Sequence, residues 1–216
     1  GGTLAAALAE RRQRDLSGLA LLAAPWDFHT DGGIAARRAA CLFEAFAPLV
    51  DVWGELPTDA LQVLFASLDP GLVARKFARF GELDPAGAEA RAFVALEDWL
   101  NDGVPLAGPV ARDCLVGWYG GNDTAGGRWL IAGRPVDPSA IRMPVCAIMP
   151  ARDRIVPPAC ARSLADAVPE ARLIEPALGH IGMVVARDAE RQVWRPLGDW
   201  LAGVADGRRS RPVSSE

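Results

Sequence analysis

Histidine and cysteine, the residue types most useful to a metal site, are scarce in this sequence. Only two of the 216 residues are histidines and four are cysteines. No CxxC pair occurs, so the ligand spacing of structural zinc sites is absent. We therefore expect no metal site, and no sequence feature indicates a cofactor of another kind.

Long apolar runs and a basic surface are missing as well. No stretch approaches the ~20 apolar residues that a membrane-spanning helix needs. The net charge is −4, and Lys76 is the single lysine among 23 basic residues, which argues against a nucleic-acid partner. A polar tail, 205–216, is expected to be disordered. Four cysteines scattered through a chain of this size favour a reducing cytoplasm.

Three short apolar runs bounded by turn residues predict buried parallel strands. They span residues 16–25, 143–153 and 170–180. A helical pattern over 157–169 joins the second run to the third, and further helices are expected over 3–13 and 188–204. This alternation of strands and helices predicts an α/β fold with a parallel sheet.

A long helix-rich segment interrupts this pattern after the first strand. It contains five helical patterns, over residues 34–47, 58–67, 70–80, 85–100 and 106–118. A segment of this length with its own structure is usually a lid or cap. It also begins at the carboxyl end of a strand, where α/β sheets bind ligands. We therefore divide the chain into a core, 1–32 with 143–204, and an inserted helical cap, 33–142. A helical subdomain that only packs is the alternative.

Asp153 and His180 are the candidate catalytic residues. Asp153 follows the predicted strand 145–149, and His180 follows the predicted strand 173–176, one strand–helix–strand unit later. Functional side chains of parallel sheets lie just past the carboxyl ends of strands, so the two loops should lie side by side. A carboxylate that fixes a histidine tautomer and stabilises its cation forms the acid–base half of a catalytic triad.

Alternatives stay open for both positions. The role of Asp153 could be limited to capping the helix that follows it. The Gly-His pair at 179–180 could belong to a loop with a purely structural role. Asp27, just after the first strand, could be the acid instead, and His29 could compete as the base. We favour Asp153 over Asp27, and we favour His180 over His29 because His29 does not follow the strand nearest the expected site.

No residue of the chain stands out as the nucleophile. In α/β hydrolases the nucleophile precedes the acid and the histidine, on a tight G-x-S-x-G turn between a strand and a helix. Gly1 and Gly2 followed by an alanine-rich helix match the end of such a turn, so we expect the nucleophile upstream of Gly1. The four cysteines occur in helical or strand patterns and are expected to be packing thiols. They are Cys41, Cys114, Cys146 and Cys160.

Five motifs together resemble one known family. GGTL at the start resembles the end of a G-x-C-x-G-G-T elbow, and LALLAAPWDF resembles the strand after it. A cap segment of that family is similar to LEDWLND, and its hinge into the acid-bearing strand is similar to GRPVDPSAIRMPVCAIMPARDRIVPP. Its histidine loop is similar to LGHIGMVV. On these motifs the chain resembles the polyhydroxyalkanoate synthases, of the α/β-hydrolase superfamily. Arg154 stands where that family usually has a histidine.

The resemblance implies the C-terminal part of an α/β-hydrolase fold, with Asp153 as the catalytic acid, His180 as the general base and a cysteine nucleophile upstream of Gly1. It implies an acyltransferase that polymerises 3-hydroxyacyl-CoA thioesters through a covalent acyl-cysteine. The implied partners are the hydroxyacyl-CoA, the polyester chain, and a second copy or a second synthase subunit, in the cytoplasm at a polyester granule surface. Without the nucleophile, this chain is expected to be inactive by itself.

Two other functions compete with this one. The first is a hydrolase of the same fold, an esterase or thioesterase, whose missing nucleophile would more often be serine. The second is a non-catalytic member or partner subunit.

Overall fold

The chain divides into two compact units in the computed structural model, which describes residues 1–68 and 71–207. The first unit combines residues 1–34 with the chain from residue 121 onward, and the second is Ala35–Gly120. The second unit is thus shorter than the predicted insertion 33–142, because residues 121–142 pack with the first unit. Residues 208–216, most of the predicted tail 205–216, lie outside the described residues.

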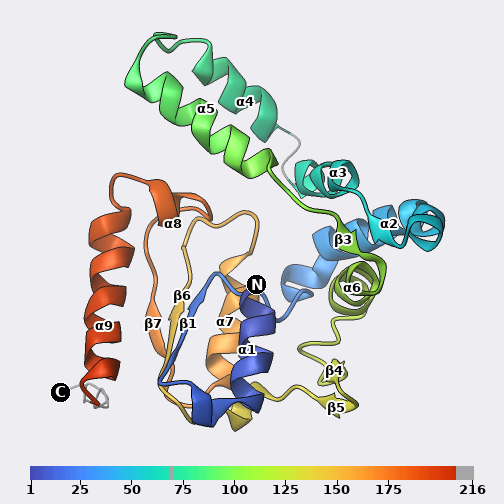
Figure 1. The fold of residues 1–216 in the computed structure, drawn as a ribbon, viewed down its shortest axis with the longest axis vertical. Coiled ribbons are helices and arrows are strands. Elements are labelled where there is room, and N and C mark those ends of the chain that lie inside the picture. Colours follow the sequence, from blue (N-terminus) through green and yellow to red (C-terminus); the bar gives the residue numbers. More distant parts are fainter. Residues whose placement is uncertain (69–70, 208–216) are drawn as a thin grey trace. The chain divides into compact units, whose positions relative to one another are not determined.

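A three-stranded parallel sheet forms the centre of the first unit (Figure 1). Its strands are β1 (Leu19–Leu22), β6 (Val145–Ile148) and β7 (Arg172–Ile174), in the order β1-β6-β7. Leu19 pairs with Val145, and Cys146 pairs with Arg172, both in parallel register. All three carboxyl ends therefore meet at one edge, and the predicted α/β fold with a parallel sheet is confirmed.

The first unit also contains several helices, turns and one short strand pair. They are α1 (Gly2–Arg11), η1 (Gln13–Asp15), η2 (Thr30–Gly33), β4 (Leu130–Ile131), β5 (Arg134–Pro135), η4 (Pro138–Ala140), α7 (Pro158–Ala167), α8 (Gly182–Val185), η5 (Glu190–Trp194) and α9 (Arg195–Ala205). Strands β4 and β5 pair with each other in antiparallel register.

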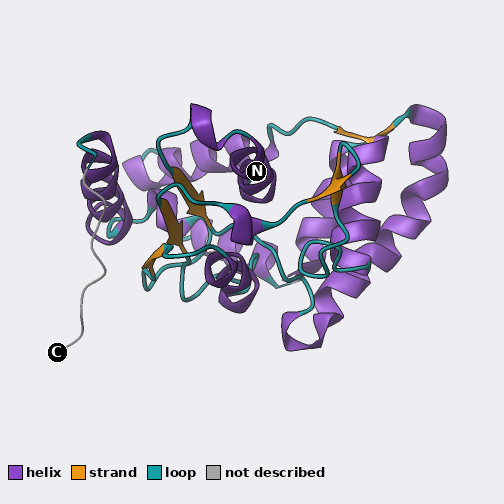
Figure 2. Cartoon of the chain, turned by 90° about the horizontal axis from the view of Figure 1, so that it is seen from below, coloured by secondary structure: helices purple, strands orange, loops and turns teal. Residues whose placement is uncertain are grey.

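Helices cover both faces of the sheet, as Figure 2 shows from below. All four residues of β6 are buried, and successive side chains of a strand point to opposite faces. Ile148 packs in one cluster with Trp200 of α9, whereas Ala147 packs in another with Ala161 of α7. Burial on both faces explains why β6 reads as a continuous apolar run.

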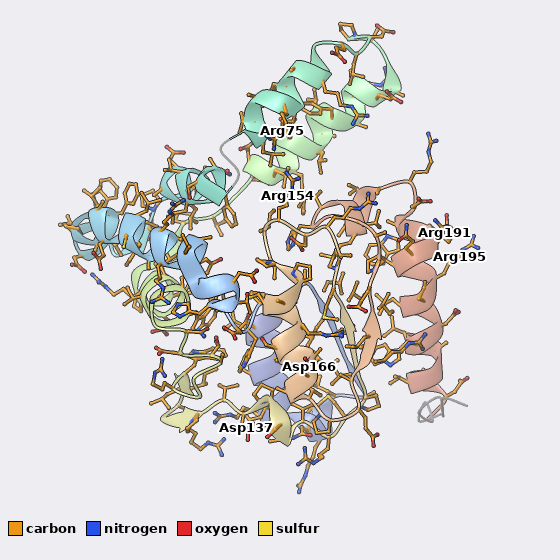
Figure 3. All side chains as sticks on the ribbon, turned by 180° about the vertical axis from the view of Figure 1, so that it is seen from behind. Arg75, Asp137, Arg154, Asp166, Arg191 and Arg195 are labelled. Carbon is orange, nitrogen blue, oxygen red and sulfur yellow. The ribbon has the colours of Figure 1, made fainter. Side chains whose placement is uncertain are left out.

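Helix α9 is amphipathic. Leu197 and Trp200 are buried against the sheet. Arg195 is exposed and pairs with Glu190 at 2.8 Å, and it projects outward together with Arg191 (Figure 3). The spacing of the buried residues is that of one helical face turned toward a core.

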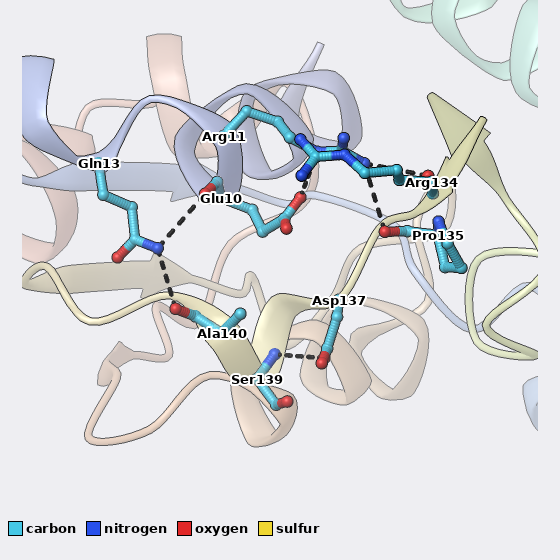
Figure 4. Close-up of polar contacts among 8 residues, drawn as sticks. All are labelled: Glu10, Arg11, Gln13, Arg134, Pro135, Asp137, Ser139 and Ala140. Carbon is cyan, nitrogen blue, oxygen red and sulfur yellow. Dashed lines mark hydrogen bonds and ion pairs between the residues drawn. The ribbon is translucent and has the colours of Figure 1, made fainter. Parts of the chain in front are cut away.

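The end of α1 is tied to the segment that enters β6 (Figure 4). Gln13 donates from Nε2 to the carbonyl of Ala140 (2.9 Å) and accepts at Oε1 from the backbone N–H of Arg142 (2.7 Å). Arg11 donates to the carbonyls of Arg134 (3.0 Å) and Pro135 (3.3 Å). These contacts fix the point at which the chain returns to the sheet.

The second unit is mainly helical. Its elements are α2 (Ile34–Trp53, whose first residue lies at the boundary), β2 (Glu55–Leu56), α3 (Thr58–Leu68), α4 (Leu72–Phe80), α5 (Ala88–Asn101), β3 (Leu106–Ala107), α6 (Gly108–Arg112) and the π-helical segment η3 (Asp113–Gly120). A core of its own surrounds Phe43, Val50 and Leu56. Helices α4 and α5 contact each other through the stacked rings of Phe80 and Phe93, 4.5 Å apart.

One predicted helix of this unit is wrong at its start. The pattern over 106–118 predicted a single helix, but Leu106 lies in β3 and pairs with Leu56 of β2. The helix begins only at Gly108, whose N–H donates to the carbonyl of Gly54 (2.8 Å). A two-residue strand is too short to show a periodicity. Pairing with a partner some fifty residues away in the chain defines it.

Candidate active site

Backbone hydrogen bonds continue past β6 and β7 and hold the two following loops together. The N–H of Ala151 donates to the carbonyl of Pro176, and that of Arg152 to the carbonyl of Leu178, both at 2.9 Å. Asp153 follows directly on one loop, and His180 lies two residues after Leu178 on the other. The two candidate residues therefore come together at the carboxyl edge of the sheet.

Asp153 and His180 form a direct hydrogen bond. Oδ2 of Asp153 lies 2.7 Å from Nδ1 of His180. The side chain of Asp153 is fully buried, whereas 26% of the His180 side chain is exposed. A carboxylate on Nδ1 favours the tautomer with its proton there, which leaves Nε2 as the basic nitrogen. This arrangement can accept a proton at Nε2 and stabilise the resulting cation.

The second oxygen of Asp153 fixes the orientation of the carboxylate. Oδ1 accepts hydrogen bonds from the N–H groups of Ile155 (2.9 Å) and Val156 (2.8 Å). The capping alternative is therefore wrong for helix α7: Asp153 orders the turn before that helix. The N-cap of α7 itself is Pro157, and the other carboxylate oxygen is committed to His180.

Asp27 and His29, the alternative acid and base, lie in the loop after β1. Oδ1 of Asp27 accepts from the backbone N–H of His29 (2.9 Å) and from Nδ2 of Asn122 (2.8 Å). Asp27 is thus engaged in a loop contact, and the carboxylate bonded to His180 is that of Asp153. Asn122 was missed in the sequence, where the Gly-Gly-Asn-Asp run indicates only a turn.

The first turn of α1 lies against the chain that leaves β1. Thr3 is buried and donates from Oγ1 to the carbonyl of Pro25 (2.8 Å). A Cβ atom on Gly2 would lie only 2.4 Å from the Cβ of Ala24, so this close approach requires glycine. Helix α1 therefore begins at the same carboxyl edge as Asp153 and His180. The role of Gly1 and Gly2 as the end of a nucleophile turn stays a prediction.

The cysteines differ in their surroundings. Burial raises the pKa of Cys146 and of Cys160 to about 11. Burial, with a smaller contribution from the charge of Asp113, also raises the pKa of Cys114 to about 11. These three thiols stay protonated near neutral pH. Cys41 is exposed on α2, so its prediction as a packing thiol is wrong.

The structure also bears on metal binding and membrane insertion for residues 1–68 and 71–207. This part of the chain has no group of three or more His, Cys, Asp or Glu side chains that could hold a metal ion. Its helices include none long and apolar enough to cross a membrane.

Comparisons with known proteins point to one family. Five curated relatives match the chain, and all are named poly(3-hydroxyalkanoate) polymerase subunit PhaC. The protein of Haloferax mediterranei is 29% identical over 205 residues, which cover 94% of this chain and 42% of that relative. The protein of Allochromatium vinosum is 30% identical over 155 residues, which cover 70% and 44%. The chain thus spans about half the length of the curated relatives it matches.

The solved structures agree on the fold. The structure of BpoC from Mycobacterium tuberculosis is similar with a TM-score of 0.51 and 21% identity, over 94% of this chain and 64% of that one. No protein-family model matches the chain. The similarity to the PhaC subunits extends over nearly the whole chain. The matched region includes the parallel sheet and the Asp153–His180 pair. The chain is thus similar to subunits of the polyhydroxyalkanoate synthase family over nearly its whole length, and it has the α/β-hydrolase fold.

Proposed function

We propose that the complete protein to which this chain belongs is an acyltransferase that polymerises 3-hydroxyacyl-CoA thioesters into a polyester. One observation carries the proposal: a buried Asp153 holds Nδ1 of His180 at 2.7 Å, in a chain similar to PhaC polymerase subunits over 94% of its length. Asp153 is the proposed catalytic acid and His180 the proposed general base. The reaction needs no cofactor.

The proposed nucleophile is a cysteine that precedes Gly1 in the complete protein. The start of α1 at the carboxyl edge supports this placement, and the high pKa values of Cys114, Cys146 and Cys160 argue against those thiols. In the first step, Nε2 of His180 takes the thiol proton and the thiolate attacks the thioester carbonyl of the substrate. The coenzyme A thiolate leaves and takes that proton, so the acyl group is now held by the cysteine.

In the second step the hydroxyl of another acyl group reacts. His180 removes the hydroxyl proton, and the oxygen attacks the acyl-cysteine carbonyl. An ester bond forms, the cysteine sulfur leaves, and His180 returns the proton to it. Asp153 stabilises the imidazolium in both steps.

Water must be kept from the acyl-enzyme, because hydrolysis would end chain growth. The inserted helical unit is the proposed cap for this purpose. The complete protein is also proposed to act with a second copy or a second synthase subunit. Its proposed location is the cytoplasm, at the surface of the polyester granule. The chain 1–216 alone, without its nucleophile, is proposed to be inactive.

The test uses the complete protein with 3-hydroxybutyryl-CoA. Released coenzyme A is followed with a thiol reagent, and the acyl product is sized by chromatography. Release together with a high-mass polyester supports the polymerase. Release with only free 3-hydroxybutyrate would replace it by the alternative, a thioesterase of the same fold.

Variants separate the roles of the residues. In the complete protein, His180→Ala should lower coenzyme A release by at least about 1,000-fold, because the general base is lost. Asp166→Asn is the matched surface control, since its side chain is exposed on α7. Release by the chain 1–216 above the level of its own His180→Ala variant would overturn the proposal that this chain is inactive alone.

A further inference from the structure

The chain crosses between the two units twice, and both crossings contain unusual backbone. At the first crossing Asp31, Gly32 and Gly33 all have positive φ angles, of 56°, 80° and 66°. At the second, Gly120 and Gly121 precede Asn122, which has a φ of 55°. Left-handed backbone and glycine pairs are typical of positions that absorb changes in φ and ψ.

Asn122 joins the two crossings directly. Its Oδ1 accepts from the backbone N–H of Phe28 (2.8 Å), and its Nδ2 donates to Oδ1 of Asp27 (2.8 Å). Asparagine suits this position because one short side chain offers both a donor and an acceptor. It also tolerates the left-handed backbone better than most residues.

The residues around Asn122 are fixed on the side of the first unit. The buried Thr124 donates from Oγ1 to the carbonyl of Trp26, and the ring of Trp26 meets that of Trp129 edge to face, with centroids 6.1 Å apart. The N–H of Asp27 donates to Oγ of Ser163 on α7 (3.0 Å). The two crossings are therefore bound together where they leave a firmly packed region, and the glycine pairs lie beyond that point.

We propose that Asn122 is a positioning residue at a hinge formed by the two connecting segments. The turns at 31–33 and 120–121 let the second unit move relative to the first. Asn122 keeps the two crossings paired so that they turn together about one place. This inference concerns the motion of the inserted unit and does not depend on the reaction proposed above.

Hydrogen exchange of the chain with Asn122→Gly provides the first test. Glycine retains the left-handed backbone and removes only the side-chain bridge. Phe28 loses its acceptor and will exchange faster whatever the role of Asn122, so the informative amides are others. They are Trp26, before the first crossing and bonded to the carbonyl of Cys160, and Arg128 and Trp129, after the second crossing and bonded to the carbonyl of Asp123.

We expect these three amides to exchange about 10-fold faster or more, because two hydrogen bonds are lost and one of them involves a carboxylate. Asn122→Asp is the second variant; it retains the acceptor for Phe28 but places a second carboxylate against Asp27. Asn101→Ala is the matched control, since it removes a single side-chain bond to Glu97 on α5. Unchanged exchange at Trp26, Arg128 and Trp129 in both Asn122 variants would overturn the proposal, whatever happens at Phe28.

A distance measurement tests the motion itself. Cys41 is exposed on α2 in the second unit, and Asp199→Cys places a second exposed thiol on α9 in the first. Spin labels at these positions report the distance between units by pulsed electron resonance. Asn122→Gly should broaden the distance distribution, whereas Asn101→Ala should not. An unchanged width in the Asn122→Gly chain would show that Asn122 does not control the hinge.

Discussion

Oδ2 of Asp153 lies 2.7 Å from Nδ1 of His180, although 27 residues separate the two in the chain. The other oxygen, Oδ1, is occupied by the N–H groups of Ile155 and Val156. The carboxylate can therefore present only one oxygen to the imidazole. This fixed orientation is what a general base at Nε2 requires.

We expect Asp153→Asn to lower the turnover of the complete protein by about 1,000- to 10,000-fold. Two N–H groups hold the carbonyl oxygen of the new amide at the Oδ1 position, so its NH2 faces Nδ1 and favours the wrong imidazole tautomer. Coenzyme A release at saturating substrate measures the effect, with Asp166→Asn as the surface control. Near-normal turnover of Asp153→Asn together with an inactive Asp27→Asn would assign the acid to Asp27.

Thiol reactivity should separate Cys41 from the other cysteines. With a pKa near 11 for Cys114, Cys146 and Cys160, only about one such thiol in a thousand is ionised at pH 8. Iodoacetamide at pH 8 should therefore modify one cysteine per folded chain, at Cys41, as counted by mass spectrometry.

A rise in pH toward 11 should speed alkylation at Cys114, Cys146 and Cys160, because the thiolate fraction grows as the pH approaches a raised pKa. Full labelling of the unfolded chain in urea serves as the control. Rapid modification of Cys146 in the folded chain at pH 8 would contradict the burial that raises its pKa.

Gln13→Ala should lower the free energy of unfolding by about 1–2 kcal/mol, because it removes the two hydrogen bonds to Ala140 and Arg142, each of which contributes about 0.5–1.5 kcal/mol. Urea unfolding followed by circular dichroism measures the change. Gln62→Ala is the control, since Gln62 makes one long bond of 3.4 Å at an exposed position. Equal losses in the two variants would mean that the contact between α1 and the segment before β6 contributes nothing specific.

The tryptophans offer a matched test of the packing of α9. Trp200 is only 4% exposed and packs on the sheet, whereas Trp99 of α5 is 62% exposed. Trp200→Ala should cost about 3–5 kcal/mol of unfolding free energy, and Trp99→Ala less than about 1 kcal/mol. Circular dichroism during urea unfolding again provides the measurement. A small loss for Trp200→Ala would contradict its place in the core.

The strand runs and the two site candidates are visible in the sequence because their physical causes are local. Burial on both faces makes β6 a continuous apolar run, and a parallel sheet places functional side chains just after its strands. These two rules favour Asp153 and His180 as candidates and predict that their loops lie side by side, while Asp27 after the first strand stays open. They do not distinguish an aspartate that only orders a local turn from one that binds histidine, and Asp153 does both.

The tertiary structure alone decides the contacts between distant segments. Strands β2 and β3 contain two residues each, so pairing between segments far apart in the chain defines them and no periodicity marks them. Asn122 contacts Asp27 across 95 residues, and the same packing assigns residues 121–142 to the first unit. The sequence determines which segments can form strands and helices, because propensity and periodicity act locally. Which polar side chains meet is decided only when the folded chain brings their segments within hydrogen-bond distance.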